Sequence, residues 1–266
     1  MILKLHDIGA AVGDLQRRLY TAGYKLEQTN VYDEVTMAVV KQLQSRGRLV
    51  ADGIYGPKTD AYLKGAETGL YLKQGDIAAA AGKLGVDVAS VMAVNEVEST
   101  GLGFVKPGYP KILFERHIFW RQLVDRRIDP VPLSKKYPGI VNQARGGYAG
   151  GVSEYTRLAV ARQINPDAAF ESCSWGAFQI MGFHWEMLGF PCVADYVAYV
   201  STGEAAQLDA FVRFILADAQ LLRALKSRKW STFARLYNGP AYAENLYDVK
   251  LARAYKRYAE MFKVAA

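Results

Sequence analysis

The segment from Val86 to Val94 constrains the fold most, because almost every residue in it is apolar. On a helix these side chains point in all directions, and a helix that is apolar all round must be buried on every side. Asp87 is a good N-cap for such a helix. We therefore expect a central helix over residues 87–99, with the rest of a mainly α-helical domain packed around it.

Two carboxylates, Glu96 and Glu98, stand at the end of this apolar helix. Residues four and seven apart share a helix face, so Glu98 stacks over Val94 and Val91 while Glu96 points to the other side. The negative end of the helix dipole and the apolar neighbours both favour the protonated acid. Glu98 therefore has the surroundings of a carboxylic acid that donates a proton near neutral pH. The alternative is that both acids form the exposed tail of the helix.

Helical patterns dominate the chain from residue 76 onward. Amphipathic or apolar helical repeats cover 76–85, a long helix over 208–225 and another over 246–262. The alternating pattern of strands is scarce, and residues 111–115 (KILFE) form the one segment that favours a short strand. The sequence predicts a mainly α domain with little β structure.

An internal repeat marks the first part of the chain. Residues 31–39 (VYDEVTMAV) align with residues 54–62 (IYGPKTDAY), matching Tyr with Tyr, Thr with Thr and Ala with Ala. Asp33 and Pro57 are residues that begin helices, so each copy is expected to be a turn that leads into a helix. A further helical stripe with Leu15 and Leu19 ends at Gly23. The sequence thus predicts a small bundle of three short helices joined by glycine turns.

These segments resemble the three-helix peptidoglycan-binding domain of many cell-wall hydrolases, over about residues 2–64. The most characteristic block is 52–59 (DGIYGPKT), a glycine-rich turn ahead of a helix N-terminus, where backbone donors face outward. The alternative is that these residues only cap a helix. The resemblance implies a binding domain over 1–66, followed by a glycine-containing linker over 67–76. The binding residues it implies are Asp52, Gly53, Tyr55, Gly56 and Thr59.

Two further blocks, 172–185 (SCSWGAFQIMGFHW) and 236–242 (LYNGPAY), follow the Glu98 segment in order. Together they resemble the signature of goose-type lysozymes and lytic transglycosylases. With 110–120 (PKILFERHIFW) included, the resemblance is closer to the N-acetylmuramidase domain of modular phage endolysins. It covers about residues 78–262 and implies a lysozyme-like domain over 77–266.

The resemblance implies an enzyme, a glycoside hydrolase that cleaves the β-1,4 bond between N-acetylmuramic acid and N-acetylglucosamine. Its catalytic acid precedes a serine and therefore falls on Glu98. A lytic transglycosylase that leaves 1,6-anhydro ends is one alternative, and a non-enzymatic wall-binding phage protein is another. Trp175, Phe178 and Trp185 could be platforms for sugar rings or ordinary core aromatics. The substrate-binding residues implied are Ser99, Ser174, Trp175, Gly176, Gln179, Tyr237 and Asn238.

Many glycosidases use a second carboxylate as nucleophile or base. Glu115 is the best candidate, because it follows an apolar run and belongs to a block that matches the family. Glu171, just before the 172–185 block, is a third possibility, while Glu96 points away from Glu98. A single acid would suit a positioned water, or ring closure to an anhydro sugar, and both remain open.

Three histidines, His6, His117 and His184, lie far apart and in no metal-ligand spacing, so we expect no metal and no cofactor. We expect Cys173 and Cys192 to be reduced core thiols. A cysteine peptidase using Cys173 or Cys192 with a histidine is the alternative.

The formal net charge is +7, but basic residues are interleaved with acids. A basic excess attracts polyanions in general, and this interleaving argues against a dedicated nucleic-acid surface. The resemblance implies peptidoglycan as the partner. No apolar run reaches the roughly 18–20 residues needed to span a bilayer, and the start of the chain lacks a signal-peptide pattern. We expect a monomer without stable membrane insertion, which accumulates in the host cytoplasm and reaches the wall after the membrane is permeabilised, leading to host cell lysis.

Overall fold

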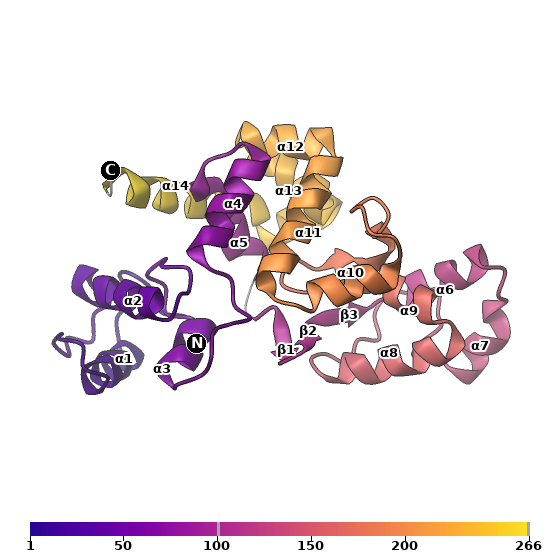
Figure 1. Cartoon of the computed structure of the whole chain (residues 1–266), viewed down its shortest axis with the longest axis horizontal. Helices are drawn as coiled ribbons and strands as arrows, with labels where there is room; N and C mark the ends of the chain where they lie inside the picture. Colours follow the sequence, from indigo (N-terminus) through magenta and orange to yellow (C-terminus); the bar gives the residue numbers. More distant parts are fainter. Residues whose placement is uncertain (100–101, 265–266) are drawn as a thin grey trace. The chain divides into compact units, whose positions relative to one another are not determined.

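The computed structural model describes residues 1–99 and 102–264 (Figure 1). The chain divides into two compact units, Met1–Ala78 and Ala79–Ala266. Helix α4 (Gln74–Leu84) begins in the first unit and continues into the second, so residues 74–76 of the expected linker are helical. The last two residues of the expected second domain lie outside the described residues.

Three helices precede α4, as the repeat predicts: α1 (Ala10–Thr21), α2 (Glu34–Arg46) and α3 (Pro57–Leu63). The Asp33 carboxylate caps α2 by accepting a hydrogen bond from the backbone N–H of Thr36 at 2.8 Å. Pro57 stands in the first turn of α3, where its missing N–H costs nothing. The buried core of this unit consists of Leu3, Val12, Leu15, Leu19, Tyr24, Tyr32, Val39, Val40, Leu43 and Tyr55.

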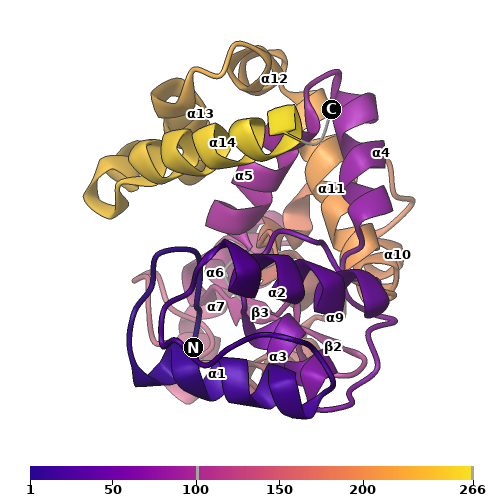
Figure 2. The ribbon, with the colours of Figure 1, turned by 90° about the vertical axis from the view of Figure 1, so that its left-hand side faces the viewer.

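Helix α5 (Val88–Glu98) is the buried helix of the second unit. No residue from 89 to 94 is more than 4% exposed, and the Asp87 carboxylate caps the helix by accepting from Ser90 N at 2.7 Å. Helix α14 (Tyr247–Val264) packs along α5 (Figure 2). The prediction of a central buried helix is confirmed.

Among the described helices, none is by itself long and apolar enough to cross a membrane. Helices α4 and α5 reach that length and composition only when taken together, and the chain bends by 113° between them.

The second unit contains two small antiparallel sheets. Strand β4 (Cys173–Trp175) lies between β3 (Ile112–Phe114) and β5 (Ile180–Met181). Strands β1 (Phe104–Lys106) and β2 (Tyr109–Pro110) pair separately. The expected strand at 111–115 is present as β3. The others were missed because two or three residues are too few to show an alternating pattern.

The prediction of one continuous helix over 208–225 is wrong, because two helices cover this region. Helix α11 (Glu204–Ala217) ends at Asp218, and α12 (Ala219–Lys226) begins directly after it. The Asp218 carboxylate accepts hydrogen bonds from Gln220 N and Leu221 N, so its local capping bonds compete with a continuous helix.

The remaining elements complete the second unit around α5 and the three-stranded sheet. They are α6 (Arg116–Asp125), α7 (Pro130–Lys136), α8 (Ser153–Ile164), α9 (Pro166–Glu171), the 3₁₀ turn η1 (Gly182–His184), α10 (Val193–Val200), α13 (Trp230–Asn238) and the 3₁₀ turn η2 (Pro240–Asn245).

Candidate functional site

Glu98, the last residue of α5, lines a cleft of about 430 Å³ in the second unit. Segments far apart in the sequence meet there: the residue before β3, the turn between β4 and β5, the end of α13 and the start of α14. The other lining residues are Lys111, residues 177–181, His184, Phe214, Tyr237, Asn238 and Tyr247.

The surroundings of Glu98 favour its protonated form. Burial raises the pKa of Glu98 to about 7, because a charged carboxylate loses hydration there. Two groups act in the opposite direction: the Asn238 side chain donates a hydrogen bond to Glu98 Oε1 at 3.0 Å, and the Lys250 charge attracts the carboxylate. Near neutral pH the group therefore exists in both protonation states, as a general acid requires.

Glu96 has a structural environment of its own. Its carboxylate accepts a hydrogen bond from the hydroxyl of Tyr258 at 2.7 Å and pairs with Arg257, both on α14. The two acids thus face different partners, as their helical spacing predicts. Glu96 links α5 to α14, whereas Glu98 lines the cleft.

Within the 172–185 block, the polar side chains of Gln179 and His184 reach the cleft wall, and Gln179 is the one that the sequence predicts. Its amide donates to Gly176 O at 2.7 Å and its Oε1 accepts from the Ser174 hydroxyl at 2.7 Å. Ser174 is 6% exposed and so supports Gln179 from behind. Gly176 has φ +72°, and a Cβ there would lie 2.5 Å from the Gln207 side chain, so only glycine fits this turn.

Two other predicted binding residues lie outside the cleft wall. Trp175 is 3% exposed and its indole N–H donates to Phe170 O at 3.1 Å, so its ring belongs to the core. Ser99 follows the last turn of α5, and its hydroxyl donates back to Asn95. Phe178 lines the cleft, but its ring is 3% exposed and stacks on Phe211 at 4.8 Å.

Tyr237 and Asn238, at the end of α13, both line the cleft. The Tyr237 hydroxyl donates to Phe178 O at 2.8 Å rather than to the acid. Burial and then the nearby Glu98 charge raise the pKa of Tyr237 well above its usual value. Asn238 is the side chain that touches Glu98.

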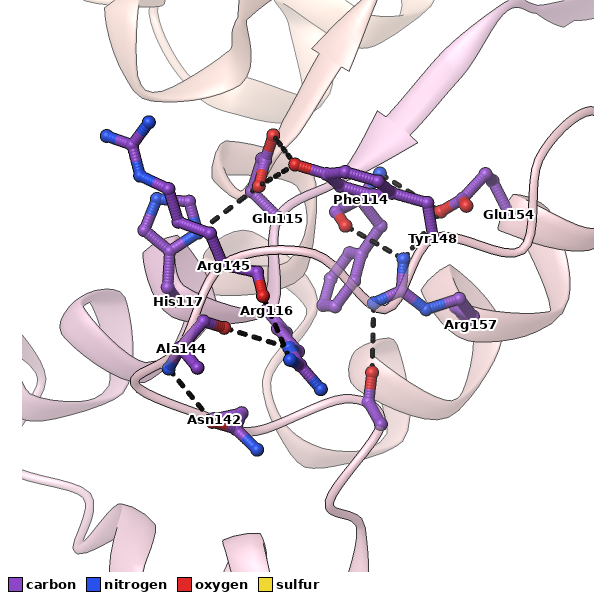
Figure 3. A network of polar contacts seen from close by, with 11 residues as sticks. Phe114, Glu115, Arg116, His117, Asn142, Ala144, Arg145, Tyr148, Glu154 and Arg157 are labelled. Atoms are coloured by element: carbon purple, nitrogen blue, oxygen red, sulfur yellow. Dashed lines mark hydrogen bonds and ion pairs between the residues drawn. The ribbon is translucent and has the colours of Figure 1, made fainter.

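Glu115 belongs to a separate polar cluster (Figure 3). Both of its carboxylate oxygens accept from the Tyr148 hydroxyl, at 2.9 and 3.0 Å, and Oε2 lies 3.2 Å from His117 Nδ1. Burial, opposed by the Glu115 charge, lowers the pKa of His117. Nearby, the buried Glu154 holds the 146–151 loop by accepting from Ala149 N and Gly150 N.

Glu171 is also engaged elsewhere, with Arg126 at 2.7 Å and the Trp185 indole N–H at 3.0 Å. Among the residues lining the cleft in the described part of the chain, Glu98 is therefore the one carboxylate.

Six residues of the cleft wall were not predicted from the sequence: Lys111, Ile180, Met181, His184, Phe214 and Tyr247. The sequence suggested His184 only as a metal ligand or as the partner of a catalytic cysteine, and burial lowers its pKa, which favours the neutral ring. Lys111 opens the segment that carries β3, so the strand prediction could have pointed to it. Phe214 and Tyr247 lie in helices whose patterns give no signal for a site.

In the first unit, Gln44 holds the turn of the second repeat. Its side-chain amide donates to Asp52 Oδ1 at 2.7 Å, Ile54 O at 3.0 Å and Thr59 Oγ1 at 3.2 Å. Its Oε1 accepts from Gly53 N at 2.9 Å. One buried side chain thus fixes most of the block on which the resemblance rests.

Gln16 does the same for the first repeat. Its amide donates to Val31 O at 3.0 Å and Thr36 Oγ1 at 2.9 Å, and its Oε1 accepts from Asn30 N at 3.0 Å. The repeat seen in the sequence is therefore a repeat of hydrogen bonding, centred on a glutamine from the preceding helix.

Most of the predicted wall-binding residues face inward as a result. Tyr55 is 1% exposed, with its hydroxyl donating to Asp60 at 2.6 Å, and Thr59 is 3% exposed. Gly53 has φ +73° and its carbonyl accepts from the Tyr32 hydroxyl. A hollow of about 370 Å³ lies instead on the surface of α1 and the end of α3, lined by Arg17, Arg18, Thr21, Ala22, Leu63 and Lys64.

The two cysteines are both free. Cys173 is fully buried, and burial raises its pKa well above the usual value, which disfavours a nucleophilic thiolate. Cys192 is exposed at the start of α10, so the expectation of two core thiols is wrong for this residue. No group of three or more His, Cys, Asp or Glu that could hold a metal occurs in residues 1–99 and 102–264.

Two family models match the chain. Residues 87–259 match the family described as "N-acetylmuramidase", and residues 8–63 match "Putative peptidoglycan binding domain". Among solved structures, the Burkholderia AP3 phage endolysin is similar over 98% of this chain and 100% of that chain, with a TM-score of 0.91 and 52% identity.

Two curated relatives come from Bacillus licheniformis. "Probable N-acetylmuramoyl-L-alanine amidase" is 40% identical over 70 residues, which is 25% of this chain and 20% of that protein. "N-acetylmuramoyl-L-alanine amidase CwlL" is 40% identical over 65 residues, 23% of this chain and 18% of that protein. The chain thus spans about a fifth of the length of these amidases.

Proposed function

The chain belongs to the N-acetylmuramidase family, and we propose that it is a phage endolysin that binds peptidoglycan and hydrolyses its glycan strands. The bond cleaved is the β-1,4 link between N-acetylmuramic acid and N-acetylglucosamine. The observation that carries the proposal is the half-buried carboxyl group of Glu98, which lines the wall of a cleft and has its pKa raised to about 7.

In the proposed mechanism Glu98 is the general acid. Its protonated carboxyl donates to the glycosidic oxygen as the bond to the muramic C1 breaks and positive charge develops on that sugar ring. Asn238 donates to Oε1, and within residues 1–99 and 102–264 no hydrogen bond reaches Oε2, which is therefore the oxygen proposed to hold the transferred proton. After the transfer, the same hydrogen bond and the Lys250 charge stabilise the carboxylate that forms.

The nucleophile in this proposal is a water molecule. No carboxylate other than Glu98 lines the cleft within the described residues, and Glu115 and Glu171 are held by other partners. Water attacks C1 and its oxygen forms the new bond to that carbon. One hydrogen stays on the new C1 hydroxyl and the other leaves as a proton, which gives a reducing muramic end. Attack by the 6-hydroxyl of the same sugar would instead leave a 1,6-anhydro end, and a cleft with a single acid also suits that reaction.

Glu98→Gln tests the assignment, with Glu115→Gln as the matched control. The glutamine keeps the shape of the acid but cannot donate the proton, so lysis of permeabilised cells should fall about a thousandfold. Glu115→Gln, outside the cleft wall, should stay within a few-fold of the parent. Retained lysis in the Glu98 variant would contradict the mechanism, and an equal loss in the Glu115 variant would restore that residue as a second catalytic group.

For wall binding, we propose the hollow on α1 and α3 as the contact surface in the first unit. It presents the basic side chains of Arg17, Arg18 and Lys64. Arg17 pairs with Asp14, and Arg18 and Lys64 share Asp60, so the group keeps one net positive charge that complements the carboxylates of peptidoglycan stem peptides. The match of residues 8–63 to a peptidoglycan-binding family supports this role. In this proposal the inward-facing residues of the 52–59 block set the shape of the unit.

A further inference from the structure

A second hollow of about 470 Å³ lies in the second unit, apart from the residues that line the Glu98 cleft. Its volume falls within the roughly 300–1,000 Å³ of small-molecule sites. One wall comes from helix α6 and the other from the 3₁₀ turn η1. The lining residues are Trp120, Arg121, Gln122, Val124, Asp125 and Phe183.

Two aromatic rings, Trp120 and Phe183, face this hollow and both are only partly buried. Within the described residues the indole N–H of Trp120 donates to no acceptor, whereas those of Trp175 and Trp185 donate to Phe170 O and Glu171. A ring with one wet face and a free N–H suits a ligand that has both an apolar face and hydroxyl groups. A pyranose ring is such a ligand.

The rim of the hollow carries polar groups that are free to bind. Arg121 and Asp125 are exposed and one helical turn apart, yet neither forms an ion pair within the described part of the chain. Gln122 accepts from Arg126 through Oε1 at 2.7 Å, which leaves its amide N–H groups for a ligand. Together they offer donors and an acceptor for sugar hydroxyl and N-acetyl groups.

Contacts beyond its lining residues hold the two elements that form the hollow. Arg126 of α6 pairs with Glu171, which is 7% exposed and also accepts from the Trp185 indole N–H. Gly182 allows η1 to approach α9 closely, since a Cβ there would lie 2.1 Å from Phe170 O. This arrangement accounts for the buried Glu171, which the proposed mechanism does not use, and it fixes the position of Phe183.

The hollow and the cleft share one short element. Phe183 lines the hollow and the next residue, His184, lines the Glu98 cleft, with ring centroids 4.3 Å apart. Peptidoglycan glycan is a polymer, so a strand cleaved at Glu98 continues beyond the cleft. A chain of sugars that passes over η1 reaches the second hollow.

We propose that the hollow between Trp120 and Phe183 is an accessory glycan subsite, which binds an N-acetylated amino sugar of the strand being cleaved. The proposal rests on the proposed muramidase function. Trp120 supplies the stacking surface, and Arg121, Gln122 and Asp125 hold the polar edge of the sugar. Long strands then bind more tightly than fragments that fill only the cleft.

The test measures binding by calorimetry, using the full chain with Glu98→Gln and peptide-free glycan strands of two or of at least six disaccharides. Trp120→Ala in this background should weaken binding of the long strands about five- to tenfold, the size expected for one lost stacking contact. Binding of the short strands should not change. Trp120→Phe should restore most of the difference. Trp230→Ala, a partly buried tryptophan that lines neither hollow, is the matched control.

If Trp120→Ala leaves long-strand binding unchanged, or weakens short and long strands equally, the accessory subsite is wrong. If the Glu98→Gln chain itself binds no short strands, the cleft assignment fails and the subsite fails with it. The two failures are therefore distinguished by which glycan length loses affinity.

Discussion

At the level of single residues, the proton affinity of Glu98 reflects two opposing influences. Burial favours the neutral acid, while the hydrogen bond from Asn238 and the charge of Lys250 favour the carboxylate. Burial is the larger influence, since the pKa rises to about 7. The hydrogen bond and the Lys250 charge can each be removed by one substitution, and in both cases the pKa of Glu98 should rise.

The lytic rate should fall as pH rises through about 7, because the acid must be protonated to act. Asn238→Ala removes a group that lowers the pKa of Glu98, so this descending limb should move to higher pH, whatever the effect on the maximum rate. Lys250→Gln should move it in the same direction. Lys256→Gln, also exposed on α14, should leave it in place. A limb that moves to lower pH in the Asn238 variant would contradict the assignment of the titrating group.

The same pKa shift predicts how stability depends on pH. The folded-state pKa of Glu98 is raised from 4.5 to about 7, so the folded protein holds this proton more tightly than the unfolded chain. The contribution of Glu98 to the free energy of unfolding is fully present below pH 4.5 and is lost as pH rises through about 7. It is at most about 3 kcal/mol.

Glu98→Gln should therefore gain stability relative to the parent between pH 4.5 and 8, measured by denaturant unfolding of the second unit. Glu260→Gln, which removes an exposed carboxylate from α14, controls for the loss of a surface charge. Parallel pH curves for parent and Glu98→Gln would show that the acid is not buried as described.

At this scale the sequence indicated Glu98, Gln179, Tyr237 and Asn238, and the structure brings them to one cleft. The sequence could not show whether Trp175 is a core aromatic or a stacking platform for a sugar ring, and the structure places it in the core. Both roles use the same residue in the same apolar context, and only burial tells them apart. The role of Glu115 was uncertain for a similar reason, because its partner Tyr148 lies in a loop far along the sequence.

Among the structural elements, the two repeats of the first unit show how a short sequence motif is stabilised. Each turn is fixed by a buried glutamine from the helix before it, Gln16 or Gln44. Repeat alignment detects the turns but not the glutamines, which stand at different distances from the two copies. The equivalence is therefore visible only in three dimensions.

Gln44→Ala should destabilise the first unit by at least about 2 kcal/mol, since it leaves several buried donors and acceptors without partners. Gln42→Ala, an exposed glutamine on the same helix, is the matched control and should change stability by less than about 0.5 kcal/mol. Thermal and denaturant unfolding of both variants measure the difference. Equal stability of the two variants would show that the buried glutamine does not hold the turn.

Helix boundaries followed the sequence where caps were plain, as at Asp33, Pro57 and Asp87. The break at Asp218 was missed because the apolar pattern continues across it, and a single capping residue decided the outcome. Periodicity reports which face is buried, whereas a cap reports where a helix ends.

In the whole molecule, wall binding is assigned to the first unit and catalysis to the second, so a substitution should be able to abolish one function and leave the other intact. In a Glu98→Gln background, Arg17→Glu with Lys64→Glu should reduce the fraction that sediments with purified peptidoglycan several-fold, because the carboxylates of the wall would meet negative charge. Lys4→Glu with Lys25→Glu makes the same change in net charge elsewhere on the first unit and should bind as the parent does. Equal loss in both pairs would mean that only overall charge matters.

The most direct test of the central claim is mass spectrometry of peptidoglycan digested by the parent chain, Glu98→Gln and Glu115→Gln. We predict reducing N-acetylmuramic ends from the parent and from Glu115→Gln, and no cleavage by Glu98→Gln. Cleaved amide bonds, 1,6-anhydro ends from the parent, or glycan cleavage that persists in Glu98→Gln would contradict a muramidase in which Glu98 is the proton donor and water the nucleophile.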